Sequence, residues 1–310
     1  MGSVVKIAAC HCSPVYLDAS ATTQKALSLI DKAADASAAL VCFPEVYIPG
    51  FPIFAAVFAP VDQTGSALYT RYVQQSIYAD GSEIASLRDK ARERGIAVSI
   101  GFSERSRRSI GCAWNSNIVI SETGMVLAHH RKLAPTYWEK LVWAPGDGAG
   151  LVVNETARAG RVGALICGEN TNPLARFALM AQAEQVHVAC FPPAWPTKRQ
   201  AGYANRTANA VRGAAHSFEA KCFTVVVAAH YDEETKRIVA GDNEDARKCL
   251  DNATQAATQF FGPDGIQFGD ERVDEEGIAY ADCDLGMCLN GKQLHDVVGG
   301  YQVSGALLCL

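Results

Sequence analysis

The amino-acid sequence predicts an α/β protein built from two sheets that are covered by helices. Short apolar runs typical of buried strands alternate along the chain with segments of helical periodicity. The order strand, helix, strand, helix, strand, hairpin occurs twice, although no sequence repeat of fixed period accompanies it. No linker rich in proline, glycine or serine separates the two halves. We therefore expect a single domain over residues 1–310, with a short C-terminal tail over about residues 290–310.

The first half is predicted to contain three strands, two helices and a hairpin. The amphipathic segment 81–95 ends at Gly95, a residue type that commonly terminates helices. Two apolar runs in residues 112–132 flank the sequence Glu-Thr-Gly, which is typical of a hairpin turn. In chain order, we expect a strand at 4–12, a helix at 21–39, a strand at 40–45, a helix at 81–95, a strand at 96–105 and the hairpin at 112–132.

The second half follows the same order. It is predicted to contain a strand at 160–169, a helix at 172–186, a strand at 186–192, a helix at 208–222 and a strand at 223–230, and it closes with strand segments at 257–268 and 278–285.

Composition and charge describe a folded protein and exclude several classes of partner. Hydrophobic residues make up 49% of the chain and charged residues 20%, which excludes a mainly disordered protein. The net charge is −5 and no run of like charges occurs, so binding of nucleic acid has no support. No stretch reaches the roughly 18 apolar residues of a membrane span, and the first residues lack the pattern of a secretory signal. We expect neither nucleic acid nor a membrane as a partner.

The cysteines and histidines do not follow the pattern of a metal site. The 11 cysteines are odd in number and scattered without a paired framework, which is typical of reduced thiols and predicts a cytoplasmic protein. Cys10, His11 and Cys12 lie on a predicted strand, where successive side chains face opposite sides. No second cysteine pair has zinc-ribbon spacing. We therefore expect no bound metal.

Three reactive side chains follow the ends of predicted strands. Glu45 ends the second strand, Lys132 ends the hairpin, and Cys167 follows the strand that begins at residue 160. Buried parallel strands commonly present functional groups just beyond their carboxyl ends. Taken singly, each residue also has an ordinary interpretation: a solvated carboxylate, a charged loop and a buried inert thiol.

Taken together, the three side chains have complementary chemistry. A cysteine attacks as a thiolate, a nearby ammonium lowers the pKa of the thiol, and a carboxylate accepts its proton. Cys167 also precedes a predicted helix, whose N-terminal dipole favours an anion. Such a trio suits attack on an unsaturated carbon that bears nitrogen, where the lysine stabilises negative charge and the glutamate transfers protons. The local signature of papain-like Cys–His hydrolases is absent, as are phosphate-loop and serine-nucleophile motifs.

Three longer segments carry a resemblance to a known family. In chain order they are VCFPEVYIPGFP, HRKLAPTYWEKLVWAPGDG and CGENTNPLARFALMAQAEQVHVACFPP. They resemble the three signature blocks of the nitrilase superfamily of carbon–nitrogen hydrolases, in the order and at the spacing of that family. The resemblance implies a four-layer αββα sandwich and a catalytic triad of Glu45, Lys132 and Cys167. It also implies that Glu139 is a second active-site carboxylate.

The residues after Cys167 are similar to those of the true nitrilases and cyanide hydratases. Family amidases usually carry Asp two residues beyond the cysteine, whereas this chain has Glu169 followed by NTNPLAR. The resemblance implies hydrolysis of an organic nitrile to a carboxylic acid and ammonia through a covalent cysteine thioimidate and thioester. It implies no metal or organic cofactor, and a homodimer or larger homo-oligomer. An amidase, a nitrile or cyanide hydratase, and a non-enzymatic binding relative are the alternatives.

Six residues near the signature blocks are candidates for the substrate pocket. Nitrilase pockets are apolar, so aromatic side chains in these loops are expected to line one, with packing in the core or an interface as the alternative. Gly168 replaces the Trp that most nitrilases have after the cysteine and leaves more room beside the nucleophile. Asn170 is expected to form hydrogen bonds around the site. The candidates are Tyr47, Trp138, Gly168, Asn170, Phe191 and Trp195.

Overall fold

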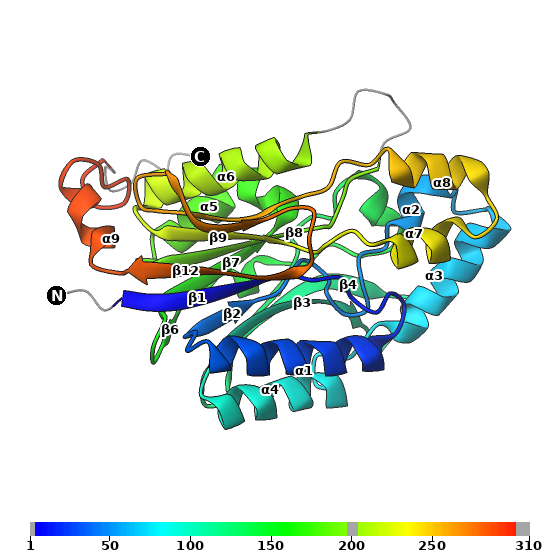
Figure 1. Cartoon of the computed structure of the whole chain (residues 1–310), viewed down its shortest axis with the longest axis horizontal. Helices are drawn as coiled ribbons and strands as arrows, with labels where there is room; N and C mark the ends of the chain where they lie inside the picture. Colours follow the sequence, from blue (N-terminus) through cyan, green and yellow to red (C-terminus); the bar gives the residue numbers. More distant parts are fainter. Residues whose placement is uncertain (1–3, 197–203, 302–310) are drawn as a thin grey trace.

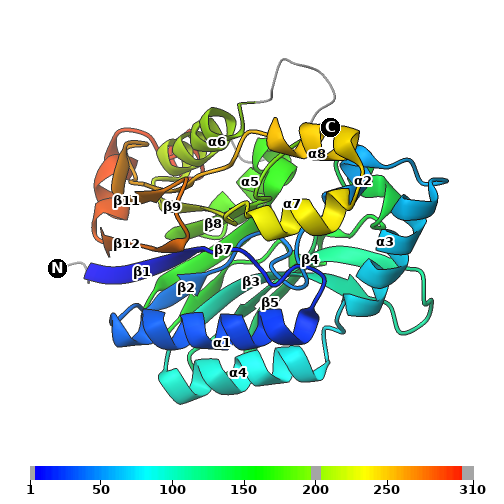
Figure 2. The same ribbon diagram turned by 45° about the vertical axis from the view of Figure 1, so that its right-hand side comes forward.

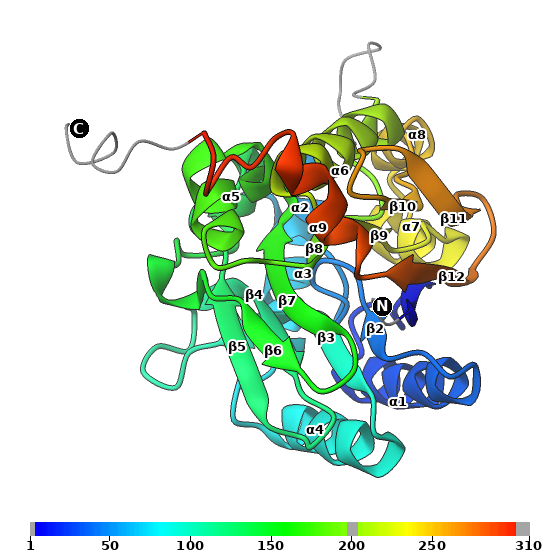
Figure 3. The same ribbon diagram turned by 90° about the vertical axis from the view of Figure 1, so that its left-hand side faces the viewer.

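The computed structural model describes residues 4–196 and 204–301 and shows two sheets stacked face to face between helices. Each sheet has six strands. Helices α1 (Ala19–Asp35) and α4 (Ser82–Arg94) cover the outer face of one sheet, and α5 (Pro173–Met180) and α6 (Asn205–Ala220) cover the other (Figure 1). The same four layers are visible when the molecule is viewed along the strands (Figure 3). The predicted αββα sandwich is confirmed.

The first sheet has a parallel centre with antiparallel strands on both sides. The strands β1, β2 and β3 are parallel, β4 and β5 continue as an antiparallel meander, and β12 pairs antiparallel with β1. Their order across the sheet is β12 (Gly277–Asp284), β1 (Val4–His11), β2 (Leu40–Cys42), β3 (Ala97–Arg105), β4 (Ala113–Ile120) and β5 (Val126–Arg131).

The second sheet has the same arrangement. The strands β7, β8 and β9 are parallel, and the strands on either side are antiparallel to them. Their order is β11 (Gln267–Arg272), β10 (Thr258–Phe261), β9 (Phe223–Ala228), β8 (Val186–Phe191), β7 (Gly160–Ile166) and β6 (Asn154–Thr156). The matching order of the two sheets agrees with the two similar halves predicted from the sequence.

The final strand joins the half of the molecule from which it is most distant in sequence. Residues 278–285 close the second half of the chain, but β12 pairs with β1 in the first sheet, from Val4 opposite Asp284 to His11 opposite Gly277. The chain therefore returns to its own beginning, and the edge of β1 is covered by a strand.

Side chains alternate between the two faces of each strand, as the pleat of a strand requires. On β1, Ile7 and Ala9 point into the layer between the sheets, whereas Ala8 and Cys10 contact the layer under α1 and α4. On α4, Ile84, Leu87 and Ala91 follow helical spacing and pack into that same layer. Both faces of the parallel strands are thus buried, which explains their nearly continuous apolar sequences.

Four helices that the sequence did not indicate gather at one end of the sandwich. They are α2 (Phe54–Val57), α3 (Gln63–Gln75), α7 (Glu233–Ala240) and α8 (Glu244–Asp251), and they lie beyond the carboxyl ends of β1 and β2 (Figures 1 and 2). Helix α3 buries only Gly65, Tyr72 and Val73, so its sequence lacks the apolar stripe that identifies a helix.

One predicted helix is shorter in the structure. The segment 172–186 begins as expected, because the Asn172 side chain accepts hydrogen bonds from the backbone N–H groups of Leu174 and Ala175. The helix ends at Met180, and Ala183 then adopts a left-handed conformation with φ of 58°. Glu184, which was predicted to lie on this helix, instead precedes β8 and is buried.

The remaining described segments are short. Helix α9 (Met287–Asn290) and the 3₁₀ turns η1 (Tyr137–Leu141), η2 (Gly148–Gly150), η3 (Cys167–Thr171) and η4 (Gly291–Gln293) complete the inventory. In the predicted tail, Val297 and Val298 pack against Met180, Ala220 and Cys222, whereas residues 302–310 lie outside the described residues. Among the described helices, none combines the length and the apolar character needed to cross a membrane.

Candidate active site

The structure brings Glu45, Lys132, Glu139 and Cys167 together at the end of the sandwich. Lys132 Nζ donates hydrogen bonds to Glu45 Oε1 at 2.9 Å and to Glu139 Oε2 at 2.7 Å. The sulfur of Cys167 and one carboxylate oxygen each of Glu45 and Glu139 all lie within 4.8 Å of one another. Residues from three separate strand ends and from the turn η1 therefore form one cluster.

Lys132 is held as a buried cation between two carboxylates. Its side chain is 1% exposed, and those of Glu45 and Glu139 are fully buried. Burial by itself lowers the pKa of Lys132, but the charges of Glu139 and Glu45 outweigh burial and raise its pKa well above the usual value. The ammonium therefore keeps its charge at neutral pH, and it is available to stabilise a negative charge nearby.

Glu45 has one bound and one free carboxylate oxygen. Oε1 accepts hydrogen bonds from Lys132 Nζ and from Asn115 Nδ2, the latter at 2.7 Å. Within the described part of the chain, no group donates a hydrogen bond to Oε2. Burial raises the pKa of Glu45 to about 7, even though the charge of Lys132 lowers it. A carboxyl group with this pKa can both accept and release a proton near neutral pH.

The backbone of the Glu45 loop approaches β3 so closely that only glycine fits opposite it. A Cβ atom on Gly101 would lie 2.4 Å from the backbone nitrogen of Val46 and 2.5 Å from the carbonyl oxygen of Pro44. Val46 itself adopts a left-handed conformation with φ of 46°. Gly101 on β3 therefore permits the loop conformation that directs Glu45 toward Lys132.

Cys167 directly follows β7 as the first residue of η3, and its backbone is strained. Its φ is 50°, in the left-handed region that non-glycine residues rarely adopt, and its side chain is partly exposed. Burial of the thiol and the charge of Glu45 raise the pKa of Cys167, while Lys132 opposes this rise. The resting thiol is therefore protonated, and a base must remove its proton before the sulfur can act as a nucleophile.

Comparison with known proteins agrees with this geometry. Residues 6–293 match the carbon–nitrogen hydrolase family. A bromoxynil-specific nitrilase of Klebsiella pneumoniae subsp. ozaenae is 36% identical over 304 residues, which cover 97% of this chain and 83% of that protein. The chain belongs to the carbon–nitrogen hydrolase family.

A second nitrilase is similar to this chain in sequence, and a solved structure is similar to it in fold. An aliphatic nitrilase of Rhodococcus rhodochrous is 35% identical over 298 residues, which cover 96% of this chain and 79% of that protein. The fold is similar to that of Saccharomyces cerevisiae Nit3, a member of branch 10 of the nitrilase superfamily, with a TM-score of 0.72 over 97% of each chain and 15% sequence identity.

In this carbon–nitrogen hydrolase, Glu169 connects the loops that carry Lys132 and Cys167. Its carboxylate accepts hydrogen bonds from the backbone N–H of Leu133 at 2.6 Å and of Ile166 at 2.8 Å. A third hydrogen bond, at 2.9 Å, joins it to His130 Nε2. Sequence reasoning used Glu169 only to distinguish branches of the family. The structural role of Glu169 could have been inferred from its position, which is two residues after Cys167.

Asn170 lies behind Cys167 and is satisfied by the protein. Its Nδ2 donates to the carbonyl oxygens of Leu165 at 3.2 Å and Cys167 at 3.1 Å. Its Oδ1 accepts a hydrogen bond from His187 Nε2 at 2.8 Å. The side chain was predicted to form hydrogen bonds around the site, and the bonds it forms are with the backbone of the cysteine turn.

Two of the candidate pocket residues line an open cavity to which the four residues of the cluster do not themselves contribute. Trp138 and Trp195 stack with ring centroids 4.6 Å apart. Together with the segment 55–60, they line a cavity of about 600 Å³. Trp138 directly precedes Glu139, so one indole of the pair lies on the same short turn as the buried carboxylate.

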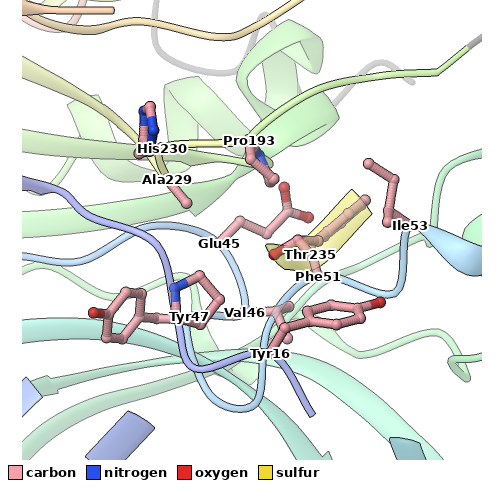
Figure 4. A pocket seen from close by; sticks show the side chains of 11 residues that line it. Tyr16, Glu45, Val46, Tyr47, Phe51, Ile53, Pro193, Ala229, His230 and Thr235 are labelled. Atoms are coloured by element: carbon pink, nitrogen blue, oxygen red, sulfur yellow. The ribbon is translucent and has the colours of Figure 1, made fainter. Parts of the chain in front are cut away.

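Tyr47 lies on the other side of Glu45. Its hydroxyl donates to the carbonyl oxygen of Ser13 at 3.3 Å, and it lines a cavity of about 10 Å³ that also contacts Glu45. Figure 4 shows the Glu45 carboxylate directed away from the rings of Tyr47 and Tyr16, toward Pro193. A cavity of this volume accommodates no more than about one water molecule.

The last two candidates, Phe191 and Gly168, differ in their packing. Phe191 is fully buried in a cluster against which Cys167 also packs. A Cβ atom on Gly168 would lie 3.2 Å from Thr136 Oγ1, which is a tight contact, and among the described residues no other side chain comes as near to this position.

Among the residues that the structure describes, two groups of side chains have the composition of a metal site. In the first, Glu45, Glu139 and Cys167 surround Lys132, whose ammonium donates to both carboxylates. The second, which contains Glu184, His216 and Cys222, is fully buried, and both oxygens of Glu184 already accept hydrogen bonds from histidines. In both groups the carboxylates are bound to positive or N–H groups of the protein.

Proposed function

We propose that this protein is a nitrilase that converts an organic nitrile and two water molecules into a carboxylic acid and ammonia. The observation that carries the proposal is the buried contact of Lys132 Nζ with Glu45 and Glu139 beside the thiol of Cys167. The relatives named as nitrilases, 35% and 36% identical to this chain, support the same assignment.

In the first step, Glu45 removes the proton of the Cys167 thiol and the sulfur bonds to the nitrile carbon. The carbon–nitrogen triple bond becomes a double bond, and the nitrogen receives the proton, which gives a thioimidate. Lys132 stabilises the negative charge that develops on nitrogen, because its ammonium is buried and retains its charge. A base is required since burial raises the pKa of the thiol.

In the second step, water adds to the thioimidate carbon and gives a tetrahedral adduct. Glu45 protonates the nitrogen, ammonia leaves, and a thioester remains on Cys167. A second water molecule attacks the thioester, the acid is released, and the thiol recovers its proton. A carboxyl group whose pKa is about 7 suits these repeated transfers in both directions. Glu139 contributes by holding Lys132 in place through its hydrogen bonds.

The cavity lined by Trp138 and Trp195 is the proposed binding site for the organic part of the nitrile. Its aromatic lining suits an apolar substituent, and it adjoins the segment that carries Glu139. Substitution of Trp195 by Ala is expected to raise KM for aromatic nitriles more than for small aliphatic nitriles.

The proposal is tested with Cys167→Ala and a panel of about a dozen aliphatic, aromatic and arylacetonitrile substrates. Ammonia and acid formation should fall below about a hundredth of the wild-type rate, because loss of a nucleophile typically costs several powers of ten. Cys112→Ser, at a partly buried cysteine between β3 and β4, is the matched control and should retain activity. Turnover by Cys167→Ala with a normal circular dichroism spectrum would contradict the covalent mechanism.

Formation of an amide is the second candidate reaction, and the lack of a side chain at Gly168 favours it. The tetrahedral adduct releases an amide if it expels the thiol in place of ammonia. Gly168 carries no side chain that would hold the adduct in one orientation. Chromatography of acid and amide from the same nitrile separates a nitrilase from a hydratase, and incubation with the amide itself detects an amidase.

We also propose that the protein forms a homodimer through α5 and α6. Leu174 on α5 and Val211 and Phe218 on α6 are large apolar side chains that are exposed on the outer layer. Sedimentation of the wild-type protein should give an even-numbered oligomer, and Leu174→Glu should shift it toward the monomer. An active wild-type monomer would contradict the proposal.

A further inference from the structure

A chain of buried polar side chains extends from the carbonyl of Cys167 into the second sheet. Asn170 binds that carbonyl and is bound by His187, whose Nδ1 contacts Glu184 Oε1 at 2.8 Å. The other oxygen of Glu184 contacts His216 Nε2 at 2.8 Å. The side chains of Glu184, His187 and His216 are completely buried. Neither the catalytic cluster nor the substrate cavity uses them.

The hydrogen-bond partners of Asn170 determine the orientation of its amide. Its nitrogen faces the carbonyl oxygens of Leu165 and Cys167, which can only accept hydrogen bonds. The amide oxygen must therefore face His187. Because this oxygen also only accepts, His187 Nε2 must carry a hydrogen.

The same reasoning places a second proton on the other side of the His187 ring. Nδ1 faces a carboxylate oxygen, so one proton lies between them. Burial raises the pKa of Glu184, but its contacts with His187 and His216 outweigh burial and lower it to about 2. The contact geometry therefore pairs a His187 ring that donates from both nitrogens with the Glu184 carboxylate.

His216 completes the group as a neutral ring. Its Nε2 donates to Glu184, and no described group contacts its Nδ1. Burial and the adjacent His187 ring together lower the pKa of His216 to about 4, although the charge of Glu184 opposes them. The two rings stack with centroids 3.6 Å apart, an arrangement that two positive charges would disfavour.

The backbone of β7 leaves space for the Glu184 carboxylate. A Cβ atom on Gly163, in β7, would lie 2.2 Å from Glu184 Oε1. Any larger residue at position 163 would displace Glu184 from His187. The strand that leads to Cys167 is thus shaped to accept the ion pair.

We propose that the Glu184–His187 ion pair fixes the Asn170 amide, and that this amide holds Cys167 in its left-handed conformation. Glu184, His187 and Asn170 are then positioning residues for the nucleophile. Asn170 donates to carbonyls on both sides of the strained turn, at Leu165 and at Cys167. His187 prevents the Asn170 amide from rotating, because the Nε2–H of His187 can donate to the amide oxygen but not to the amide nitrogen. The importance of the Cys167 turn for catalysis rests on the proposed function. The protonation of His187 is independent of that function.

The first experiment replaces Asn170 by Leu, a side chain of similar size without hydrogen-bonding groups. The turn loses both donors, so kcat should fall about 100-fold with little change in KM, since a displacement of about 1 Å costs this much. Alkylation of Cys167 by iodoacetamide, measured without any nitrile, should slow in the folded variant. His216→Gln is the matched control, because Gln can still donate to Glu184 and does not contact Asn170. It should keep the wild-type kcat and alkylation rate.

The second experiment uses nitrogen NMR of the wild-type protein labelled in its histidines. His187 should show protons on both ring nitrogens. In Glu184→Gln, the amide can donate to Nδ1, so the ring should become neutral and keep only its Nε2 proton.

The outcomes separate this inference from the proposed function. Normal kcat and alkylation in Asn170→Leu, with only a lower melting temperature, would overturn the positioning role. A neutral His187 in the wild-type protein would overturn the ion pair. Slower alkylation in Asn170→Leu without turnover of any nitrile by the wild-type protein would support the inference and overturn the proposed function.

Discussion

The carboxylate of Glu169 and the backbone N–H of Leu133 are joined by a hydrogen bond of 2.6 Å, which links the loop after Cys167 to the loop after Lys132. The two loops follow β7 and β5, which belong to different sheets. The distance between the Cys167 sulfur and the Lys132 ammonium therefore depends on the contact of Glu169 with Leu133, in which neither Cys167 nor Lys132 takes part.

Glu169→Gln tests this link. Three N–H groups bind the carboxylate, and an amide nitrogen cannot accept a hydrogen bond from any of them. We expect a loss of about 1–3 kcal/mol in the free energy of unfolding and a fall in kcat of about 10-fold to 100-fold. Urea unfolding and steady-state kinetics measure the two effects. Glu155→Gln, at an exposed position on β6, is the control. Equal losses in both variants would argue against the link.

The pH dependence of turnover tests the role of Glu45. The base must be deprotonated to accept the thiol proton, so kcat/KM should rise with pH and be half-maximal near pH 7. Asn115 donates to Glu45 Oε1 and thereby lowers the pKa of that carboxyl. In Asn115→Ala the pKa should increase, and the rising limb should move to higher pH. A limb that moves to lower pH, or does not move, would assign the titration to another group.

Removal of the buried cation should destabilise the protein as well as inactivate it. Lys132→Met leaves Glu45 and Glu139 buried without their partner. Breaking a buried ion pair from one side costs about 3–5 kcal/mol, which denaturant unfolding can measure. The double variant Lys132→Met with Glu139→Gln should recover part of this stability while remaining inactive. A single variant as stable as the wild type would mean that the carboxylates are not held as anions.

The size of residue 168 should influence the ratio of acid to amide. A side chain there would begin 3.2 Å from Thr136 Oγ1, so Thr136 must shift slightly, and it would restrict the adduct on Cys167. We expect mainly acid from the wild-type protein and a smaller share of amide from Gly168→Trp. Chromatography of both products from one nitrile measures the ratio, and circular dichroism checks the fold of the variant. Amide as the main wild-type product from several nitriles would place the protein with the hydratases.

Local sequence signals predicted most of the strands, although not β6, and they pointed to three residues of the proposed catalytic cluster. Apolar runs such as 40–45 and 160–166 indicated buried strands, and Glu45, Lys132 and Cys167 were expected at strand ends. The structure brings these residues together with Glu139. These signals succeed because a strand buried on both faces must be apolar throughout, so the first polar residue after it marks its end.

Other features depend on contacts between segments that are distant in the sequence. By itself, the sequence determined the alternation of strands and helices and the identity of the reactive side chains. Only the tertiary structure decided that β12 pairs with β1, that Glu184 leaves the expected helix, and that His187 and Asn170 meet behind the cysteine turn. The reason is that apolar periodicity reports which face of an element is buried, whereas a hydrogen bond or an ion pair also requires the position of its partner.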